Sequence, residues 1–196
     1  MQNFRTIKEE IRILAWDDGP FDFKKKGKDI LIGVIYRGGK ILDGMLKTEI
    51  EIDGLDSTER IIESTNKTKH KDLRVMMLDG ITFGGFNTVD IKDIYMRTKL
   101  PVIVVNRKKP DLEKFKKSLK LLPEYEKRLT AVKNAGPFYY TNVKNRKICF
   151  QCAGLKKEDA EKIIKTTATI GLIPEPLRAA HLIATGIVLG ESVGRA

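Results

Sequence analysis

The stretch Leu73–Gly80, LRVMMLDG, decides the fold. Its almost continuous apolar run, ending at Asp79-Gly80, is typical of a β-strand that is buried on both faces of a sheet. A second run of this kind, PVIVV, follows at Pro101–Val105, and the segment between the two predicts a helix near Asn87–Thr98. Strands that alternate with helices predict parallel strands with helices packed on the sheet.

Upstream of this unit the pattern indicates a meander of antiparallel strands. Strands are expected over Ile11–Trp16, Ile30–Tyr36 and Ile41–Ile52, and Gly38-Gly39 favours a hairpin between the last two. A helix is expected from Asp56 to about Asn66, because an acidic cap followed three residues later by Glu is a common helix start.

Downstream, helices and short strands alternate to the end of the chain. Helices are expected over Asp111–Leu122, Glu124–Asn134, Glu158–Thr169 and Pro174–Gly190, and short strands over Phe138–Thr141 and Ile148–Cys152. We predict an α/β fold with a ribonuclease-H-like mixed five-stranded sheet, three antiparallel strands and then β-α-β-α, with helices on both faces. In this arrangement the first and fourth strands are parallel neighbours. Residues 1–196 are predicted to form one domain.

The composition limits the classes of protein. The 196 residues include 37 Lys and Arg against 26 Asp and Glu, a formal net charge of +11, and 41% are hydrophobic. This content supports a packed core, and no apolar run approaches the roughly 20 residues of a membrane-spanning helix. No signal-peptide pattern opens the chain and two cysteines make no disulfide framework, so a cytoplasmic protein without a membrane partner is expected. The basic charge suits nucleic acid, and no signal fixes an oligomeric state.

Two predicted neighbouring strands end in acid, at Asp17-Asp18 and at Asp79. The ends of parallel neighbours lie roughly 5 Å apart, so these carboxylates can share one divalent ion. Mg²⁺ or Mn²⁺ prefers such oxygen ligands and can activate water at a phosphodiester. The sequence does not choose between Asp17 and Asp18. The alternative interpretation is that these acids are ordinary turn residues.

A third carboxylate is expected at Asp56, where the third strand gives way to a helix, with Asp53 and Glu59 as alternates. Asp56 also fits a helix cap, and Glu59 also fits the partner position of a capping box.

The loop Gly80–Phe86, GITFGGF, follows the buried strand. Gly84 and Gly85 allow backbone N–H groups to approach a phosphate, and Phe86 can stack on a base. In the last predicted helix, Arg178 lies one turn before His181. From the residues alone, His181 is interpreted as an ordinary core histidine.

Taken together, the motifs resemble the endonuclease V superfamily, most closely an archaeal branch of endonuclease-V-like deoxyuridine endonucleases. Four segments spread over nearly the whole chain carry the resemblance: AWDDGPF (Ala15–Phe21), GLDSTE (Gly54–Glu59), LDGITFGGFN (Leu78–Asn87) and IPEPLRAAHLI (Ile173–Ile183). The resemblance implies Asp17, Asp56 and Asp79 as ligands of Mg²⁺ or Mn²⁺, with Asp56 in place of the family's Glu. It also implies a role for His181 near the metal, and for Arg107 or Lys108 in place of the family's lysine after the fifth strand.

One departure concerns the base. Endonuclease V carries a Pro-Tyr-x-Pro wedge before its Glu, whereas Met45–Asp53 (MLKTEIEID) has none. Base eversion must then use other side chains, or the substrate is single-stranded or already distorted. We expect a metal-dependent endonuclease that nicks DNA containing deoxyuridine or deoxyinosine, in DNA repair, with His181 or Arg178 positioning water or phosphate. The alternatives are a non-catalytic nucleic-acid-binding module with this fold, or a nuclease acting on RNA.

Overall fold

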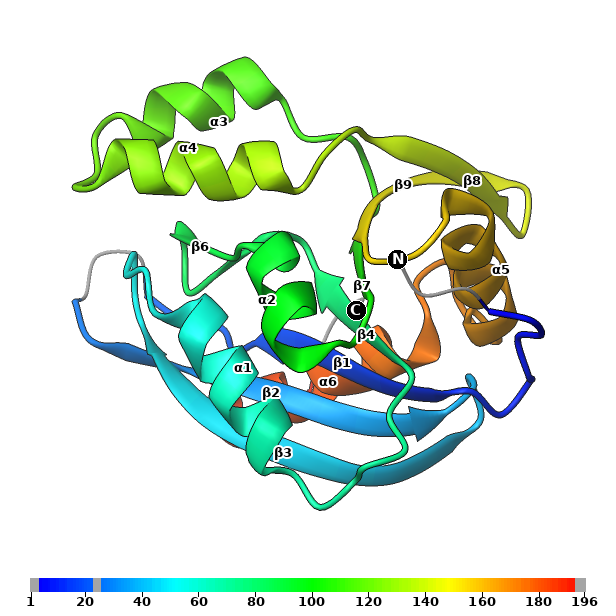
Figure 1. The fold of residues 1–196 in the computed structure, drawn as a ribbon. Helices are drawn as coiled ribbons and strands as arrows, with labels where there is room; N and C mark the ends of the chain where they lie inside the picture. Colours follow the sequence, from blue (N-terminus) through cyan, green and yellow to red (C-terminus); the bar gives the residue numbers. More distant parts are fainter. Residues whose placement is uncertain (1–3, 23–25, 193–196) are drawn as a thin grey trace.

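Strands β1 and β4 form the centre of a mixed sheet, paired in parallel from Ile13 with Val75 to Trp16 with Leu78. The computed structural model describes residues 4–22 and 26–192. In this part of the chain the main sheet has seven strands in the order β3-β2-β1-β4-β7-β9-β8 (Figure 1). They are β1 (Arg12–Asp18), β2 (Lys28–Arg37), β3 (Ile41–Glu51), β4 (Val75–Asp79), β7 (Val102–Asn106), β8 (Tyr139–Val143) and β9 (Arg146–Ala153).

The predicted α/β class and the order of the first five strands are confirmed, but the sheet is wider than the five strands expected. Strand β9 pairs antiparallel with β7, and β8 pairs with β9. The turn between β8 and β9 is made by Lys144 and Asn145, both with positive φ. This geometry suits a tight hairpin, yet neither residue is the glycine that usually marks one.

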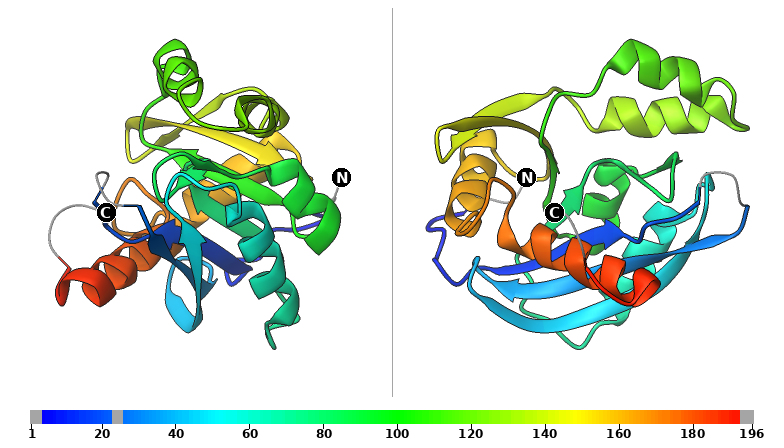
Figure 2. Two further views of the ribbon diagram at one scale, coloured as in Figure 1. Left: turned by 90° about the vertical axis from the view of Figure 1, so that its left-hand side faces the viewer. Right: turned by 180° about the vertical axis from the view of Figure 1, so that it is seen from behind.

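Two helical layers cover the sheet. Helices α5 (Lys157–Thr167) and α6 (Glu175–Leu189) share a core with one face of the sheet, and α1 (Ser57–Lys67) and α2 (Ile91–Thr98) share a core with the other. Figure 2 shows α6 lying along the strands, on the side opposite α1. Because side chains alternate along a strand, Ala15 belongs to the α6 side and Trp16 to the α1 side.

A pair of helices, α3 (Leu112–Leu119) and α4 (Tyr125–Asn134), projects beyond the sheet. Figure 1 shows these helices packed against each other beyond α2 and β6. We call residues 111–134 the helical arm. Within the described ranges 4–22 and 26–192, no helix combines the length and apolarity needed to cross a membrane.

The glycine-rich loop does not lead directly into a helix as predicted. Strands β5 (Thr82–Phe83) and β6 (Asn87–Thr88) form a small hairpin around it, and α2 begins only at Ile91. Asp90 caps this helix by accepting hydrogen bonds from the backbone N–H groups of Lys92 and Asp93, both at 3.0 Å. The loop glycines therefore lie in a hairpin turn, away from the helix N-terminus.

Candidate functional site

Asp17 and Asp79 stand side by side at the ends of β1 and β4. The last paired residues of these strands are Trp16 and Leu78, so the next position on each strand is an aspartate. Neighbouring parallel strands are about 4.8 Å apart, which brings the two carboxylates to one edge of the sheet.

The two carboxylates also share a face. Ala15 and Met77 pack on the α6 side of the sheet, and residues two positions apart on a strand point the same way. Asp17 and Asp79 thus point toward α6, whereas Asp18 points to the opposite face. Asp17, which the sequence could not distinguish from Asp18, is the neighbour of Asp79.

Helix α6 adds a histidine to this pair. His181 Nδ1 lies 3.0 Å from Asp17 Oδ2, and the histidine side chain remains 35% exposed while that of Asp17 is 6% exposed. The helix begins with Pro174-Glu175-Pro176, and its proline falls in the first turn, where a missing N–H costs nothing. The Nδ1 atom of His181 is thus held by the buried carboxylate of Asp17 at the edge of the sheet.

The electrostatics of the cluster favour protons or a cation. Burial raises the pKa of Asp17 to about 8, with a further rise from the charge of Asp79. Burial also raises the pKa of Asp79, against the opposing effects of Arg107 and His181. The hydrogen bond to Asp17 raises the pKa of His181. Asp17 and Asp79 therefore hold their protons more tightly than free carboxyl groups do, although His181 and Arg107 oppose this effect.

Asp18 and Asp29 form a second pair of acidic residues, on the face of the sheet opposite Asp17 and Asp79. The backbone N–H of Gly84 donates to Asp18 Oδ2 at 2.6 Å. Asp29 is 5% exposed, and burial, followed by the charge of Asp18, raises its pKa to about 7. Sequence reasoning missed Asp29, although an antiparallel hairpin necessarily brings the start of β2 beside the end of β1.

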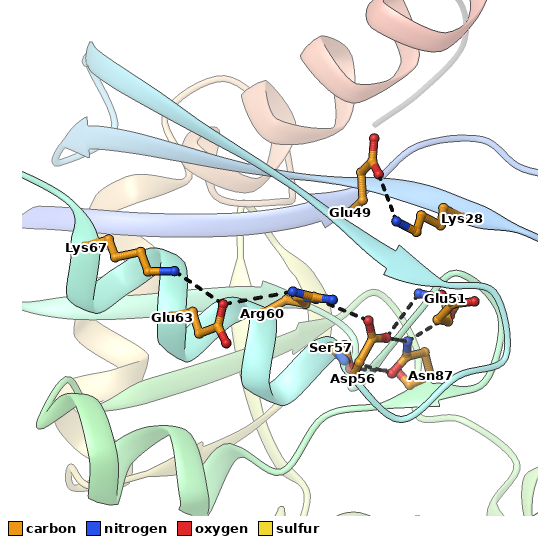
Figure 3. A network of polar contacts seen from close by, with 9 residues as sticks. All are labelled: Lys28, Glu49, Glu51, Asp56, Ser57, Arg60, Glu63, Lys67 and Asn87. Atoms are coloured by element: carbon orange, nitrogen blue, oxygen red, sulfur yellow. Dashed lines mark hydrogen bonds and ion pairs between the residues drawn. The ribbon is translucent and has the colours of Figure 1, made fainter.

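Asp56 lies in a separate network, which Figure 3 shows. Its Oδ1 accepts from Glu51 N at 3.0 Å and from Asn87 Nδ2 at 2.7 Å, and Arg60 Nε lies 3.3 Å from Oδ2. Asp56 occupies the N-cap position without a side-chain capping bond. Asn87 Oδ1 accepts the Ser57 N–H at 3.0 Å instead.

None of these contacts joins Asp56 to Asp17 or Asp79, so its role as a third ligand stays a prediction that this network does not support. The alternates are also engaged elsewhere. Arg97 donates two hydrogen bonds to Glu59, at 2.5 and 2.8 Å. Asp53 Oδ1 accepts the Phe86 N–H at 2.9 Å.

The glycine loop is held from both sides. Gly85 has φ +88°, and a Cβ at this position would lie 2.4 Å from Asp53 Oδ1, so a side chain does not fit. Phe86 packs on Phe115 of the helical arm with ring centroids 5.7 Å apart. The loop therefore connects the Asp18 side of the sheet to the arm.

A buried arginine fixes the helical arm to this region. Arg128 of α4 is 2% exposed and donates to four backbone carbonyl groups. The acceptors are the oxygens of Pro123 (3.0 Å), Gly54 (2.9 Å), Phe86 (2.6 Å) and Asp53 (2.7 Å). Arg128 was not among the predicted site residues, because in the sequence it resembles any surface arginine of an amphipathic helix.

The two arginines expected near nucleic acid differ in their surroundings. Arg107 is exposed just after β7, and its charge acts on both Asp79 and His181. Arg178 Nε donates to Glu175 Oε2 at 2.7 Å, and Glu175 Oε1 accepts the Ile170 N–H at 3.2 Å. Arg178 therefore serves to brace the start of α6.

Residues 4–22 and 26–192 contain no group of three His, Cys, Asp or Glu side chains placed so that they could hold a metal ion. Asp17 and Asp79 supply two neighbouring carboxylates. Mg²⁺ commonly takes one or two protein carboxylates and fills its other positions with water and substrate phosphate.

The sheet order and the acidic strand ends define a ribonuclease-H-like α/β protein with an Asp–Asp–His cluster at the carboxyl edge of its central parallel strands. The model of a family described as Endonuclease dU matches residues 9–188, and the chain belongs to this family.

Relatives cover the whole chain. A UPF0215 protein of Methanothermobacter thermautotrophicus is 49% identical over 197 residues, covering 99% of this chain and 96% of the relative. The crystal structure of a protein of unknown function from Archaeoglobus fulgidus is 40% identical, with a TM-score of 0.82, and covers 90% of this chain and 98% of its own. Both are similar along nearly their full length.

The fold extends to endonuclease V. The structure of Ciona intestinalis endonuclease V, in complex with a 24mer DNA containing an inosine followed by a ribo-adenosine, has a TM-score of 0.55. It is 18% identical and covers 87% of this chain and 82% of its own. At this identity the likeness is one of fold, and it confirms the architecture that the sequence motifs implied.

Proposed function

We propose that this protein is an endonuclease that hydrolyses a phosphodiester in DNA containing a deaminated base, and that residues 1–196 act as one domain in DNA repair. The observation that carries the proposal is the pairing of Asp17 and Asp79 on one face of the sheet, with His181 bonded to Asp17. Neighbouring carboxylates at the carboxyl ends of parallel strands are typical of sites that use a divalent cation on phosphate.

The donor set fits Mg²⁺ or Mn²⁺. Both ions prefer hard oxygen ligands, and Asp17 and Asp79 offer two neighbouring carboxylates at one edge of the sheet. When bound, such an ion supplies positive charge that orients water and offsets the charge of the phosphate.

Each residue of the cluster has a separate role in the proposed reaction. Asp17 and Asp79 hold the cation, and the Asp17 carboxylate fixes the ring of His181 through Nδ1. We assign proton transfer at the reacting water or leaving oxygen to the opposite ring nitrogen, Nε2. Arg107, exposed beside the cluster, is assigned to the phosphate.

The assignment of DNA with a deaminated base rests on three supports. The family description names dU, and the fold is shared with a protein whose structure contains inosine-bearing DNA. The chain also carries a net charge of +11, which suits a polyanion. Both cysteines are free thiols, as is usual in a reducing compartment, and we place the activity in the cytoplasm.

The test is a nicking assay with Mg²⁺ or Mn²⁺ on oligonucleotides that contain one deoxyuridine, one deoxyinosine or neither. Single-stranded DNA, double-stranded DNA and RNA versions are compared for the wild-type chain and Asp79→Ala. We expect nicking near the lesion that is lost in the variant, while the variant still binds DNA. Binding without nicking of any substrate would favour the non-catalytic module, and preferential nicking of RNA would reassign the substrate.

A further inference from the structure

The turn that joins α3 to α4 presents apolar side chains to solvent. Leu121 is 87% exposed, the largest exposed fraction of any large apolar side chain in residues 4–22 and 26–192. Leu122 after it is half-buried and Pro123 is exposed. Single exposed leucines are common on protein surfaces, but three successive apolar residues at the end of a projecting arm form a small apolar tip.

The tip is held in place despite its exposure. The backbone N–H groups of Leu121 and Leu122 donate back into the last turn of α3, both at 3.1 Å, so the chain leaves the helix as a 3₁₀ turn. Arg128 donates to Pro123 O at 3.0 Å and to Gly54 O at 2.9 Å, which joins the tip to the turn before α1. Little ordering is therefore needed when a ligand meets Leu121.

The arm stands over the carboxyl edge of the sheet. Gly80, which follows Asp79, lines the same pocket as Phe115 and Lys116 of α3. In the left view of Figure 2, α3 stands above the ends of the central strands, with α6 to one side and α2 to the other. Leu121 is five residues beyond Lys116. This spacing is about 8 Å along a helix, or roughly two base steps of DNA. One DNA molecule can therefore contact both the acidic cluster and the tip.

The charges around the tip fit a nucleic acid. Lys117 and Lys120 are exposed one turn and one residue before Leu121. In the part of the chain that the structure describes, no ion pair joins either lysine to a carboxylate, whereas Lys116 pairs with Glu113 at 3.2 Å. An apolar side chain beside uncompensated lysines suits a ligand with flat apolar bases and negatively charged phosphates.

We infer that Leu121 inserts into the base stack of double-stranded DNA beside the lesion, and that Lys117 and Lys120 contact the flanking phosphates. The inference rests on the proposed function, since it takes lesion-containing DNA as the ligand. Leucine and proline are among the side chains that proteins insert between base steps, where they partly unstack the bases. Unstacking costs least at a mismatched base, such as the uracil that faces guanine after cytosine is deaminated.

Insertion predicts a difference between duplex and single strand. In a duplex the side chain of Leu121 leaves water and fills the space between two ordered bases. A flexible single strand has no ordered stack to open, so its binding depends on the lysines and not on Leu121. The arm tip therefore acts on the double-stranded substrate.

The test measures unstacking and binding without added divalent cation, so that neither depends on cleavage. Duplexes carry one deoxyuridine opposite guanine, with 2-aminopurine as its neighbour on one side or on the other, because this base fluoresces more strongly when it is unstacked. For the wild-type chain at saturation we expect a rise of about twofold or more on at least one side.

In Leu121→Ala most of this rise should be lost. Affinity for the duplex should fall about tenfold, because a leucine side chain is no longer buried in the complex. Affinity for the same sequence as a single strand should stay within about threefold of wild type. Leu121→Met keeps an apolar side chain of similar length and should keep the rise.

Ile170→Ala is the matched control. Ile170 is also apolar and 70% exposed, but it lies before α6, where its backbone oxygen accepts from Lys144 Nζ at 2.6 Å. This variant should behave as the wild type does with both substrates. Thermal unfolding checks that all three variants are folded, as expected for changes of exposed side chains.

A wild-type chain that gives no fluorescence rise with the lesion duplex would overturn the inference. An equal rise in Leu121→Ala would do so as well, and so would an equal loss in Ile170→Ala. These failures are distinguishable from a failure of the proposed function. Nicking at deoxyuridine with no effect of Leu121→Ala on the rise would refute the role of Leu121 and leave the nuclease intact. A rise that depends on Leu121, without nicking of any substrate, would support the inserted leucine and refute the nuclease.

Discussion

Asp17 Oδ2 and His181 Nδ1 lie 3.0 Å apart although 164 residues separate them in the chain. One end of this contact is a strand terminus and the other is a helix that packs on the same face of the sheet. The contact connects α6 to the acidic edge of the sheet. The pKa values of Asp17 and His181 therefore depend on the folding of the chain.

The binding of Mg²⁺ should depend on pH in a definite direction. The pKa of Asp17 is raised to about 8, mainly by burial, so below this pH the cation must displace a proton. Apparent affinity should then rise about tenfold per pH unit from roughly pH 6 and level off near the pKa. Calorimetric titration of Mg²⁺ at several pH values measures this. An affinity for Mg²⁺ that stays constant over this pH range would contradict the raised pKa of Asp17.

Asp79→Asn should stabilise the protein in the absence of a cation. Burial raises the pKa of Asp79, so the folded state binds this proton more tightly than the unfolded state does. The stability that the proton contributes is present below the unfolded value, near 4, and is lost as pH rises through the folded pKa. Thermal unfolding of the variant and the wild type should therefore differ more at about pH 9 than at about pH 5. A gap of equal size at both pH values would argue against this account.

Arg128→Ala should be among the most destabilising changes in the arm. The substitution leaves four backbone carbonyl groups without their donor, which is expected to cost about 3–5 kcal/mol, or roughly 10 °C in Tm for a chain of this size. Lys127→Ala is the control on the same helix, since its side chain is 75% exposed and should change stability by less than about 0.5 kcal/mol. Thermal unfolding of both variants gives the comparison, and similar Tm values would show that Arg128 does not anchor the arm.

The strand ends were predictable because their signals are local. A buried apolar run that ends in Asp-Gly fixes both the strand and the place of Asp79, and the order of elements places β1 beside β4. The choice of Asp17 over Asp18 depends on the register, which decides the face, and the sequence alone does not set it.

The remaining features depend on distant packing. In the sequence Leu121 looks like a core residue of an amphipathic helix, and its exposure follows only from the way Arg128 fixes the arm. Asp56 was expected at the site because it follows a strand, but Asn87, 31 residues away, engages its carboxylate. Such pairings arise from tertiary contacts that leave no periodicity in the chain.

Asp56→Ala separates a structural role from a metal ligand. The variant loses the hydrogen bonds to Glu51 N and Asn87 Nδ2, and we expect a loss of about 1–2 kcal/mol in stability. Because its carboxylate lies outside the Asp17–Asp79 pair, nicking at saturating Mg²⁺ should stay within about tenfold of wild type, a loss of less than about 1.4 kcal/mol in transition-state stabilisation. The measurement is the single-turnover rate beside that of Asp79→Ala. Equal loss in the two variants would restore Asp56 as a third ligand.

Arg107→Ala should weaken DNA binding in a way that salt reveals. Arg107 is exposed beside Asp79 and His181, where it can contact one phosphate without reading a base. Losing one phosphate contact should reduce the slope of log affinity against log salt by about 0.7–0.9 and leave the preference for deoxyuridine unchanged. Lys71→Ala is the matched control, because Lys71 precedes β4 and so lies near the opposite edge of the sheet, where its Nζ donates to Asn66 O at 3.2 Å. Binding titrations at several salt concentrations measure this slope for the wild type and both variants. A slope lowered equally in both variants would indicate diffuse attraction by the basic surface instead of a phosphate contact at the cluster.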